Sequence, residues 1–65
     1  MFSLTPKEHA VLQLVCKGFS NREIGLSLSI AETTARSHVV SIIHKLNVRN
    51  RTACAAEAIR RSLIA

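Results

Sequence analysis

The chain has 65 residues, a formal net charge of +5 and an apolar fraction of 48%, with only two aromatic side chains. This length allows one small domain, whose core must be built from aliphatic side chains. No apolar run approaches the roughly 20 residues that cross a bilayer, and no signal peptide is visible. The sequence therefore predicts a cytoplasmic protein without a membrane partner.

The charge is distributed unevenly along the chain. Residues 1–33 carry three basic and three acidic side chains, whereas residues 34–65 carry six basic and one acidic side chain. The whole excess of +5 therefore lies in the second half, as is typical of a protein that binds a polyanion. If the polyanion is DNA, binding should weaken steeply as the salt concentration rises.

Capping patterns predict two helices in the first half of the chain. The first opens at the capping box Thr5–Glu8, which has proline at the first helical position, and Gly18 ends it in the left-handed conformation. The second opens at the capping box Ser20–Glu23 and is about eight residues long. Gly25 inside this helix is unfavourable by about 0.5–1 kcal/mol relative to alanine, which indicates either close packing or chance drift.

Two further helices are predicted in the second half. The third spans about residues 32–46, with Asn47 as a left-handed stop. The fourth begins after the cap residue Asn50 and runs to about Arg61. Apolar positions at helical spacing form the buried stripe of the third helix: Ala35, Val39, Ile42, Ile43 and Leu46.

The junction between the second and third helices is the most informative part of the chain. Only about residues 29–31 separate them, and Ile30 is expected to fill the angle that they make. A short helix, a tight turn and a longer helix form a helix-turn-helix over about residues 20–39, whose second helix enters the major groove of DNA.

The solvent face of residues 32–46 carries no acidic side chain, and it consists of Thr33, Arg36, Ser37, Val40, Ser41 and His44. We predict that Arg36, Ser37 and Val40 contact bases. Arginine can donate two hydrogen bonds to guanine, serine can bond a base or a phosphate, and valine suits a thymine methyl. A solvated face with one stray valine is the alternative. The basic residues Lys45, Arg49 and Arg51 would bind phosphates and so anchor the helix.

Four collinear segments resemble the successive signatures of the LuxR-type, or GerE-like, helix-turn-helix domain: Leu4–Glu8, Gly18–Ile24, Thr34–Val39 and Lys45–Thr52. The resemblance extends from Leu4 to Ile64. It implies an all-α, four-helix domain over residues 1–65, forming the C-terminal part of a longer response regulator. The implied function is sequence-specific binding of double-stranded DNA to regulate transcription, without enzymatic activity, and RNA polymerase is a further candidate partner.

The resemblance also implies roles for individual residues. It places bases against Arg36, Ser37 and Val40, and it gives Thr34, His38, Lys45 and Arg51 roles at the DNA backbone or in the fold. The full set predicted to contact the DNA backbone is Ser20, Asn21, Thr33, Thr34, His38, Ser41, His44, Lys45, Arg49 and Arg51. The chain departs from the family where Ala31 cannot cap the third helix, a loss of about 1 kcal/mol, and where Ala10 removes a common acidic residue. Gly25 stands in place of alanine, and Asn47 and Ser62 in place of glycines.

The alanine-rich fourth helix is the usual dimer surface of this family. Ala55 and Ile59 are expected to face the core, leaving a small-residue stripe on another face. Two copies could approach closely there about a two-fold axis, and DNA would stabilise the weak pair. The residues predicted to form this homodimer surface are Cys54, Glu57, Ala58 and Arg61.

Other function classes are less well supported. The histidines (His9, His38 and His44) and the two cysteines (Cys16 and Cys54) lack metal-ligand spacing, so no metal, cofactor or small-molecule ligand is predicted. Both thiols are expected to be reduced and at least partly buried, with a redox-sensing Cys54 left open. The main alternative function is a protein-interaction or dimerisation module that has lost DNA binding. A basic membrane-binding helix would need large apolar side chains where the fourth helix has alanine.

Overall fold

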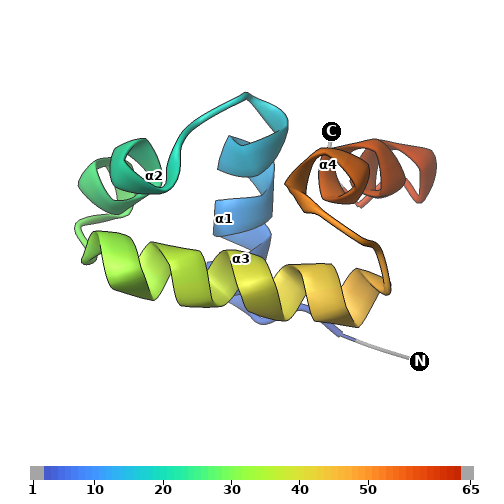
Figure 1. The fold of residues 1–65 in the computed structure, drawn as a ribbon, viewed down its shortest axis with the longest axis horizontal. Helices are drawn as coiled ribbons and strands as arrows, with labels where there is room; N and C mark the ends of the chain where they lie inside the picture. The colour runs from blue at the N-terminus through green and yellow to red at the C-terminus, as the bar shows by residue number, and fades with distance from the viewer. Residues whose placement is uncertain (1–2, 64–65) are drawn as a thin grey trace.

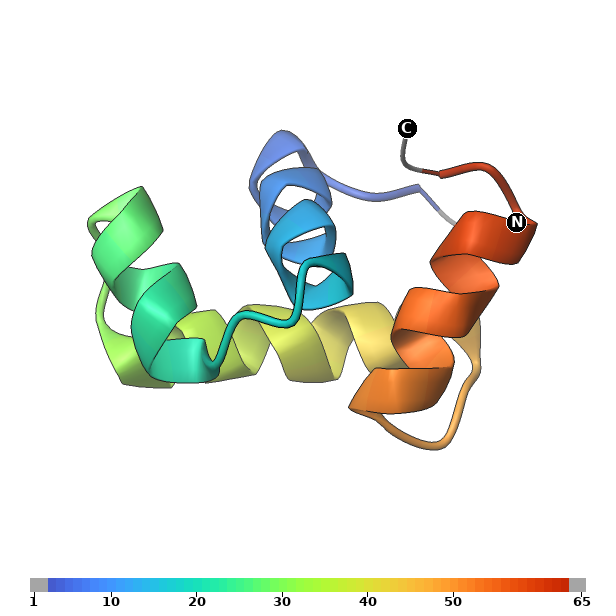
Figure 2. The same ribbon diagram turned by 90° about the horizontal axis from the view of Figure 1, so that it is seen from above.

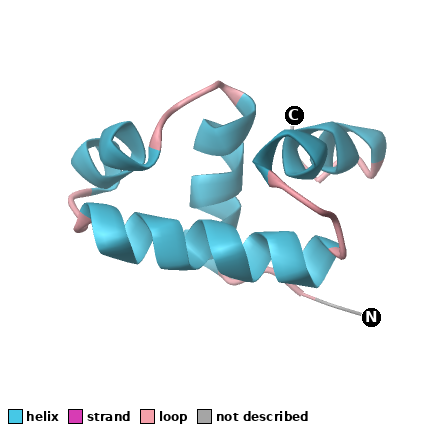
Figure 3. Ribbon diagram, in the orientation of Figure 1, coloured by secondary structure: helices cyan, strands magenta, loops and turns pink. Residues whose placement is uncertain are grey.

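A computed structural model describes residues 3–63, and within that range every regular element is a helix (Figure 3). The helices are α1 (Pro6–Cys16), α2 (Asn21–Leu28), α3 (Glu32–Leu46) and α4 (Arg51–Arg60). The predicted all-α class is confirmed, and each predicted boundary agrees with the observed one to within a residue or two.

Three of the four helices begin where a side chain caps them. The hydroxyls of Thr5 and Ser20 accept from backbone N–H groups three residues on, and the glutamates there accept from the cap N–H groups in return. Asn50 Oδ1 accepts from the Ala53 N–H group at 2.8 Å. The N-cap of α3 is Ala31, and its methyl group makes no capping bond, as the sequence predicts.

All four helices end in the same way, although only one of them uses glycine. A residue of positive φ follows each last turn, and the next residue donates its N–H group to the carbonyl five positions back. The positive-φ residues are Gly18, Ser29, Asn47 and Ser62. The donors of the returning bonds are Phe19, Ile30, Val48 and Leu63, each of which is apolar and packs partly buried against the core. Each connection therefore closes its helix and adds a side chain to the core.

The longest helix, α3, organises the domain. It contacts each of the other three helices, and α2, α1 and α4 follow one another along its length (Figures 1 and 2). These three helices lie on one side of α3, and no helix covers its opposite side (Figure 1). The buried apolar residues form one cluster at the centre: Val11, Leu12, Val15, Ile24, Ala35, Val39, Ile42, Leu46, Cys54 and Ala58.

Gly25 allows α2 to approach the turn of the helix-turn-helix motif closely. A Cβ atom at this position would lie 2.7 Å from the backbone oxygen of Ile30 and 3.4 Å from the Glu32 nitrogen. Ile30 also donates its N–H group to the Gly25 carbonyl at 2.9 Å. The structure therefore supports close packing as the reason for this glycine, and a side chain here would force the turn away from α2.

The predicted orientation of α4 is wrong. Cys54 and Ala58, which are predicted to form a dimer surface, are buried in the core, and Ile59, which is predicted to face the core, is 64% exposed. The helix is therefore rotated about its axis relative to the prediction. With alanine at several positions around the helix, its apolar periodicity is too weak to identify one inward face.

Candidate nucleic-acid interface

The uncovered side of α3 displays the three residues predicted to contact bases. Arg36, Ser37 and Val40 are exposed. Arg36 and Val40 are four residues apart, so they lie on the same face of the helix. Val40 is 46% exposed. The predicted backbone-contacting residues Thr33, Thr34 and His44 are also exposed on α3, and His38 is half-buried beside them.

The hydroxyl of Ser37 is already engaged within its own helix. Its Oγ donates to the Thr33 carbonyl at 3.1 Å, a common arrangement for serine on a helix surface. The oxygen keeps its lone pairs, so in this rotamer Ser37 can accept a hydrogen bond but cannot donate one. A base amino group, such as that of adenine or cytosine, is the partner that fits it without a change of rotamer.

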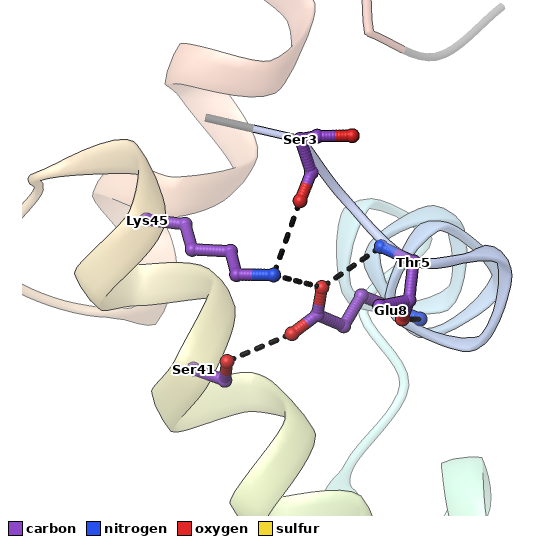
Figure 4. A network of polar contacts seen from close by, with 5 residues as sticks. All are labelled: Ser3, Thr5, Glu8, Ser41 and Lys45. Atoms are coloured by element: carbon purple, nitrogen blue, oxygen red, sulfur yellow. Dashed lines mark hydrogen bonds and ion pairs between the residues drawn. The ribbon is translucent and has the colours of Figure 1, made fainter. Parts of the chain in front are cut away.

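Ser41 and Lys45 lie on the edge of α3 that faces α1, where both contact Glu8 (Figure 4). Ser41 Oγ donates to Glu8 Oε2 at 2.7 Å, and Lys45 Nζ donates to Glu8 Oε1 at 2.6 Å. Lys45 Nζ also donates to the Ser3 carbonyl at 3.1 Å. The Thr5 N–H group donates to Glu8 Oε1 at 2.9 Å, so the capping-box glutamate also joins α1 to α3.

The environment of Glu8 keeps it ionised at any ordinary pH. Burial raises the pKa of this carboxyl, but hydrogen bonds from Lys45, the Thr5 backbone and Ser41, with the charge of Lys45, outweigh burial and lower the pKa to about 2. From the sequence alone, Glu8 is predicted only to complete the capping box. The sequence does indicate that Glu8 is buried, because it lies on the same helical face as three apolar residues, Val11, Leu12 and Val15. A carboxylate on a buried face requires a positive partner.

Arg51, at the start of α4, holds the start of α2 in place. Its Nη1 donates to Asn21 Oδ1 at 2.5 Å and its Nη2 donates to the Phe19 carbonyl. A guanidinium group only donates, so the side-chain oxygen of Asn21 must face it, and the amide nitrogen faces away. Ser20, beside Asn21, is committed to its capping box with Glu23. Of these predicted backbone contacts, Asn21 keeps two side-chain donors to offer a phosphate.

Besides Lys45 and Arg51, the basic residues of the second half fall into two groups. Arg36 and Arg49 are exposed, with no carboxylate within ion-pair distance in the described chain. Arg60 and Arg61 instead both pair with Glu57 on their own helix, and their hydrogen bonds lower the pKa of that carboxyl to about 2. Glu57 and Arg61, both predicted dimer residues, are thus occupied within one protomer, and Arg61 also donates to the Leu46 carbonyl.

The thiols show no sign of activation. Cys16 is half-buried and Cys54 is buried, neither in a disulfide, and burial raises the pKa of both. A raised pKa lowers the thiolate fraction that redox chemistry needs, so a redox-sensing Cys54 is not supported. Among residues 3–63, no three histidine, cysteine or acidic side chains gather as a metal site. No helix in that range is long and apolar enough to cross a membrane.

The arrangement of these helices and residues matches that of a known family of regulators. Residues 2–58 match the sequence profile described as "Bacterial regulatory proteins, luxR family". The chain belongs to this family. The LuxR-type domain is the DNA-binding helix-turn-helix domain of transcription regulators, and the predicted fold and function are confirmed at this level.

Individual relatives agree with this assignment. The chain is 47% identical over 57 residues, 88% of its length, to the transcriptional regulatory protein DegU of Brevibacillus brevis, of which it covers 24%. The solved structure of the transcription factor GerE superposes with a TM-score of 0.87 at 32% identity, over 98% of this chain and 97% of that one. The response regulator ChrA of a heme-sensing two-component system gives a TM-score of 0.92 at 39% identity, over 98% of this chain and 32% of that one. The chain therefore spans about a quarter of DegU and a third of ChrA.

Proposed function

We propose that this LuxR-type domain reads a DNA sequence by inserting α3 into the major groove. The observation that carries the proposal is the uncovered side of α3, where Arg36, Ser37 and Val40 lie exposed and where α3 has no acidic residue after Glu32 in its first turn. A helix of this length fits the groove, and these three side chains have partners among base edges. The domain would act as the DNA-binding part of a longer regulator working in the cytoplasm.

We propose a division of labour for the residues around these three. Thr33, Thr34, His38, His44 and Arg49 would contact the phosphate backbone directly. Asn21 would do so through its amide nitrogen, with Arg51 holding the side chain in place rather than contacting DNA itself. Ser41 already donates its hydroxyl hydrogen bond to Glu8, so we assign it to the packing of α3 and not to a phosphate. Phosphate contacts of this kind set the register in which bases are read.

Replacing Arg36 with alanine is expected to reduce selectivity more than general affinity. The test compares a duplex selected from a random library by the unmutated chain with a duplex of scrambled sequence. Arg36→Ala should cost about 1–3 kcal/mol on the selected duplex and much less on the scrambled one. Arg49→Ala is the matched control, because a phosphate contact should be lost equally from both. An equal loss on both duplexes for Arg36→Ala would show that Arg36 does not read bases.

We also propose that two copies bind adjacent half-sites and touch through the exposed face of α4. In the structure this face consists of Thr52, Ala56 and Ile59, which are all exposed and share one side of the helix. A contact between two such small faces falls well below the roughly 1,200 Å² of a stable interface. DNA would therefore have to supply the pairing by placing two domains about one helical turn apart.

Ile59→Arg is expected to abolish cooperative binding to a duplex with two half-sites and to leave binding to one half-site within about twofold. The substitution is tolerated by the fold because Ile59 is exposed, whereas a change at the buried Ala58 would disrupt the core. Gel-shift titrations on one- and two-site duplexes measure both effects. Undiminished cooperativity in Ile59→Arg would place the contact between copies elsewhere.

A further inference from the structure

Lys45 differs from the exposed Arg36 and Arg49 because two acceptors hold its ammonium group, and one of them is a carboxylate. Nζ lies 2.6 Å from Glu8 Oε1 and 3.1 Å from the Ser3 carbonyl oxygen (Figure 4). The Glu8 side chain is 6% exposed, whereas that of Lys45 is 32% exposed. The ion pair is thus anchored on the buried side by Glu8 and remains open to solvent on the side of Lys45.

This geometry limits what Lys45 can do for DNA. An ammonium group has three N–H donors, and two of them are taken by the protein. The third is available on the exposed side, at a position fixed by the other two bonds. An unrestrained lysine has a flexible four-carbon chain and can reach phosphates in many registers of the DNA. Lys45, in contrast, can contact a phosphate only if the DNA backbone passes close to its fixed ammonium group.

The anchor itself is rigid. Glu8 accepts from three donors at once: the backbone N–H group of Thr5 at the cap of α1, the hydroxyl of Ser41 on α3, and the ammonium group of Lys45 one turn further along α3. Ser41 and Lys45 are four residues apart, so the carboxylate spans one turn of the helix that carries the proposed base contacts. Glu8 thereby fixes the position of Lys45 relative to Arg36 and Val40.

We propose that Glu8 is a positioning residue for DNA selectivity, which holds Lys45 so that its phosphate contact forms in the correct register and not on arbitrary DNA. The proposal rests on the proposed function, since it concerns how α3 discriminates between sequences. Glu8 also lowers the affinity for non-specific DNA, because its negative charge neutralises the positive charge of Lys45.

The test is Glu8→Gln in the 65-residue chain. Glutamine keeps the size of the side chain and can still complete a capping box, but it no longer neutralises Lys45. The binding constant is measured against salt concentration on the selected and the scrambled duplex. On the scrambled duplex, Glu8→Gln should bind about 3- to 8-fold more tightly near 0.1 M salt, with a salt slope steeper by up to about 0.9. The selected duplex should gain less, so the selectivity ratio falls.

Two controls separate positioning from net charge. Glu57→Gln raises the net charge by the same amount as Glu8→Gln, but on α4, away from the uncovered side of α3. Its salt slope on scrambled DNA should therefore equal that of the unmutated chain. In the Glu8→Gln/Lys45→Met double variant, the gain on scrambled DNA should disappear, because the lysine that produced it is absent. A purely structural role for Glu8 would lower binding to both duplexes and would not steepen the slope.

The possible outcomes are distinguishable. An unmutated chain that binds neither duplex in a salt-dependent way would contradict the proposed function itself. Salt-dependent, selective binding by the unmutated chain together with an unchanged slope in Glu8→Gln, or an equal gain in Glu57→Gln, would overturn the role of Glu8 alone. If circular dichroism shows that Glu8→Gln does not fold, Glu8→Asp replaces it. This variant keeps the charge but is too short to hold Lys45 and Ser41 together, so its selectivity ratio should also fall; an unchanged ratio would overturn the proposal.

Discussion

Replacing Leu46 with aspartate is expected to abolish cooperative folding of the domain at room temperature. Leu46 is 1% exposed and belongs to the central cluster where α3 meets α4. Losing a buried leucine costs about 2–5 kcal/mol, and burying a carboxyl group without a partner adds several more. The whole stability of a chain of 65 residues is roughly 3–10 kcal/mol, so the substitution should exceed it.

Leu26→Asp provides a matched control, because it makes the same chemical change on a surface. Leu26 is 73% exposed on α2, and substitutions at such positions change stability by about 0.5 kcal/mol. Thermal melts followed by far-ultraviolet circular dichroism should show a native transition for Leu26→Asp and none for Leu46→Asp. A cooperative helical melt in Leu46→Asp would mean that the core is not where the structure places it.

The sequence predicts the helices of this domain well because their boundaries are encoded locally. Thr5, Ser20 and Asn50 are caps that each act within three or four residues, and the structure confirms all three. The left-handed stops at Gly18 and Asn47 are equally local and are also confirmed. The end of the second helix near Ser29 is also predicted correctly, but the left-handed conformation of Ser29 is not, because serine carries no strong preference for positive φ.

The predictions from sequence are wrong or incomplete where the structure depends on contacts between residues that are distant in the chain. Which face of α4 is buried depends on the fit against α1 and α3, and small side chains such as Cys54 and Ala58 fit where the larger Ile59 would not. The second role of Glu8 depends on Ser41 and Lys45, which are 33 and 37 residues away. Arg51 similarly finds its acceptors 30 and 32 residues back along the chain. The candidate base contacts, in contrast, follow from the periodicity of one helix, so Arg36, Ser37 and Val40 could be placed together from sequence.

These distant polar contacts also predict how the domain responds to acid. In the folded chain the pKa of Glu8 is about 2, against an ordinary value of 4.5. The unfolded chain therefore takes up a proton at this residue at a higher pH than the folded chain does. The stabilisation from Glu8 is complete above about pH 5 and is lost progressively as the pH falls toward 2. The difference between the two pKa values corresponds to about 3 kcal/mol.

Acid unfolding should therefore depend strongly on Glu8. Urea denaturation of the unmutated chain is expected to show a steep fall in the free energy of unfolding between pH 5 and pH 2. Glu8→Gln should be less stable at pH 7 by about 3 kcal/mol, and its stability should decline much less on acidification, since glutamine does not titrate. The two curves should converge near pH 2, where the glutamate is half-protonated and the ion pair with Lys45 is failing.

Glu57→Gln distinguishes the buried carboxylate from an ion pair at the surface. The pKa of Glu57 is also lowered to about 2, through hydrogen bonds from Arg60 and Arg61, but the Glu57 carboxylate pairs with side chains only three and four residues away and does not itself bridge two helices. Solvent and salt screen such a pair, so Glu57→Gln should retain most of the acid sensitivity of the unmutated chain, and 0.5 M salt should remove the remaining difference. If Glu8→Gln instead lost stability on acidification as steeply as the unmutated chain, the contact between α1 and α3 would not be held by an ionised Glu8.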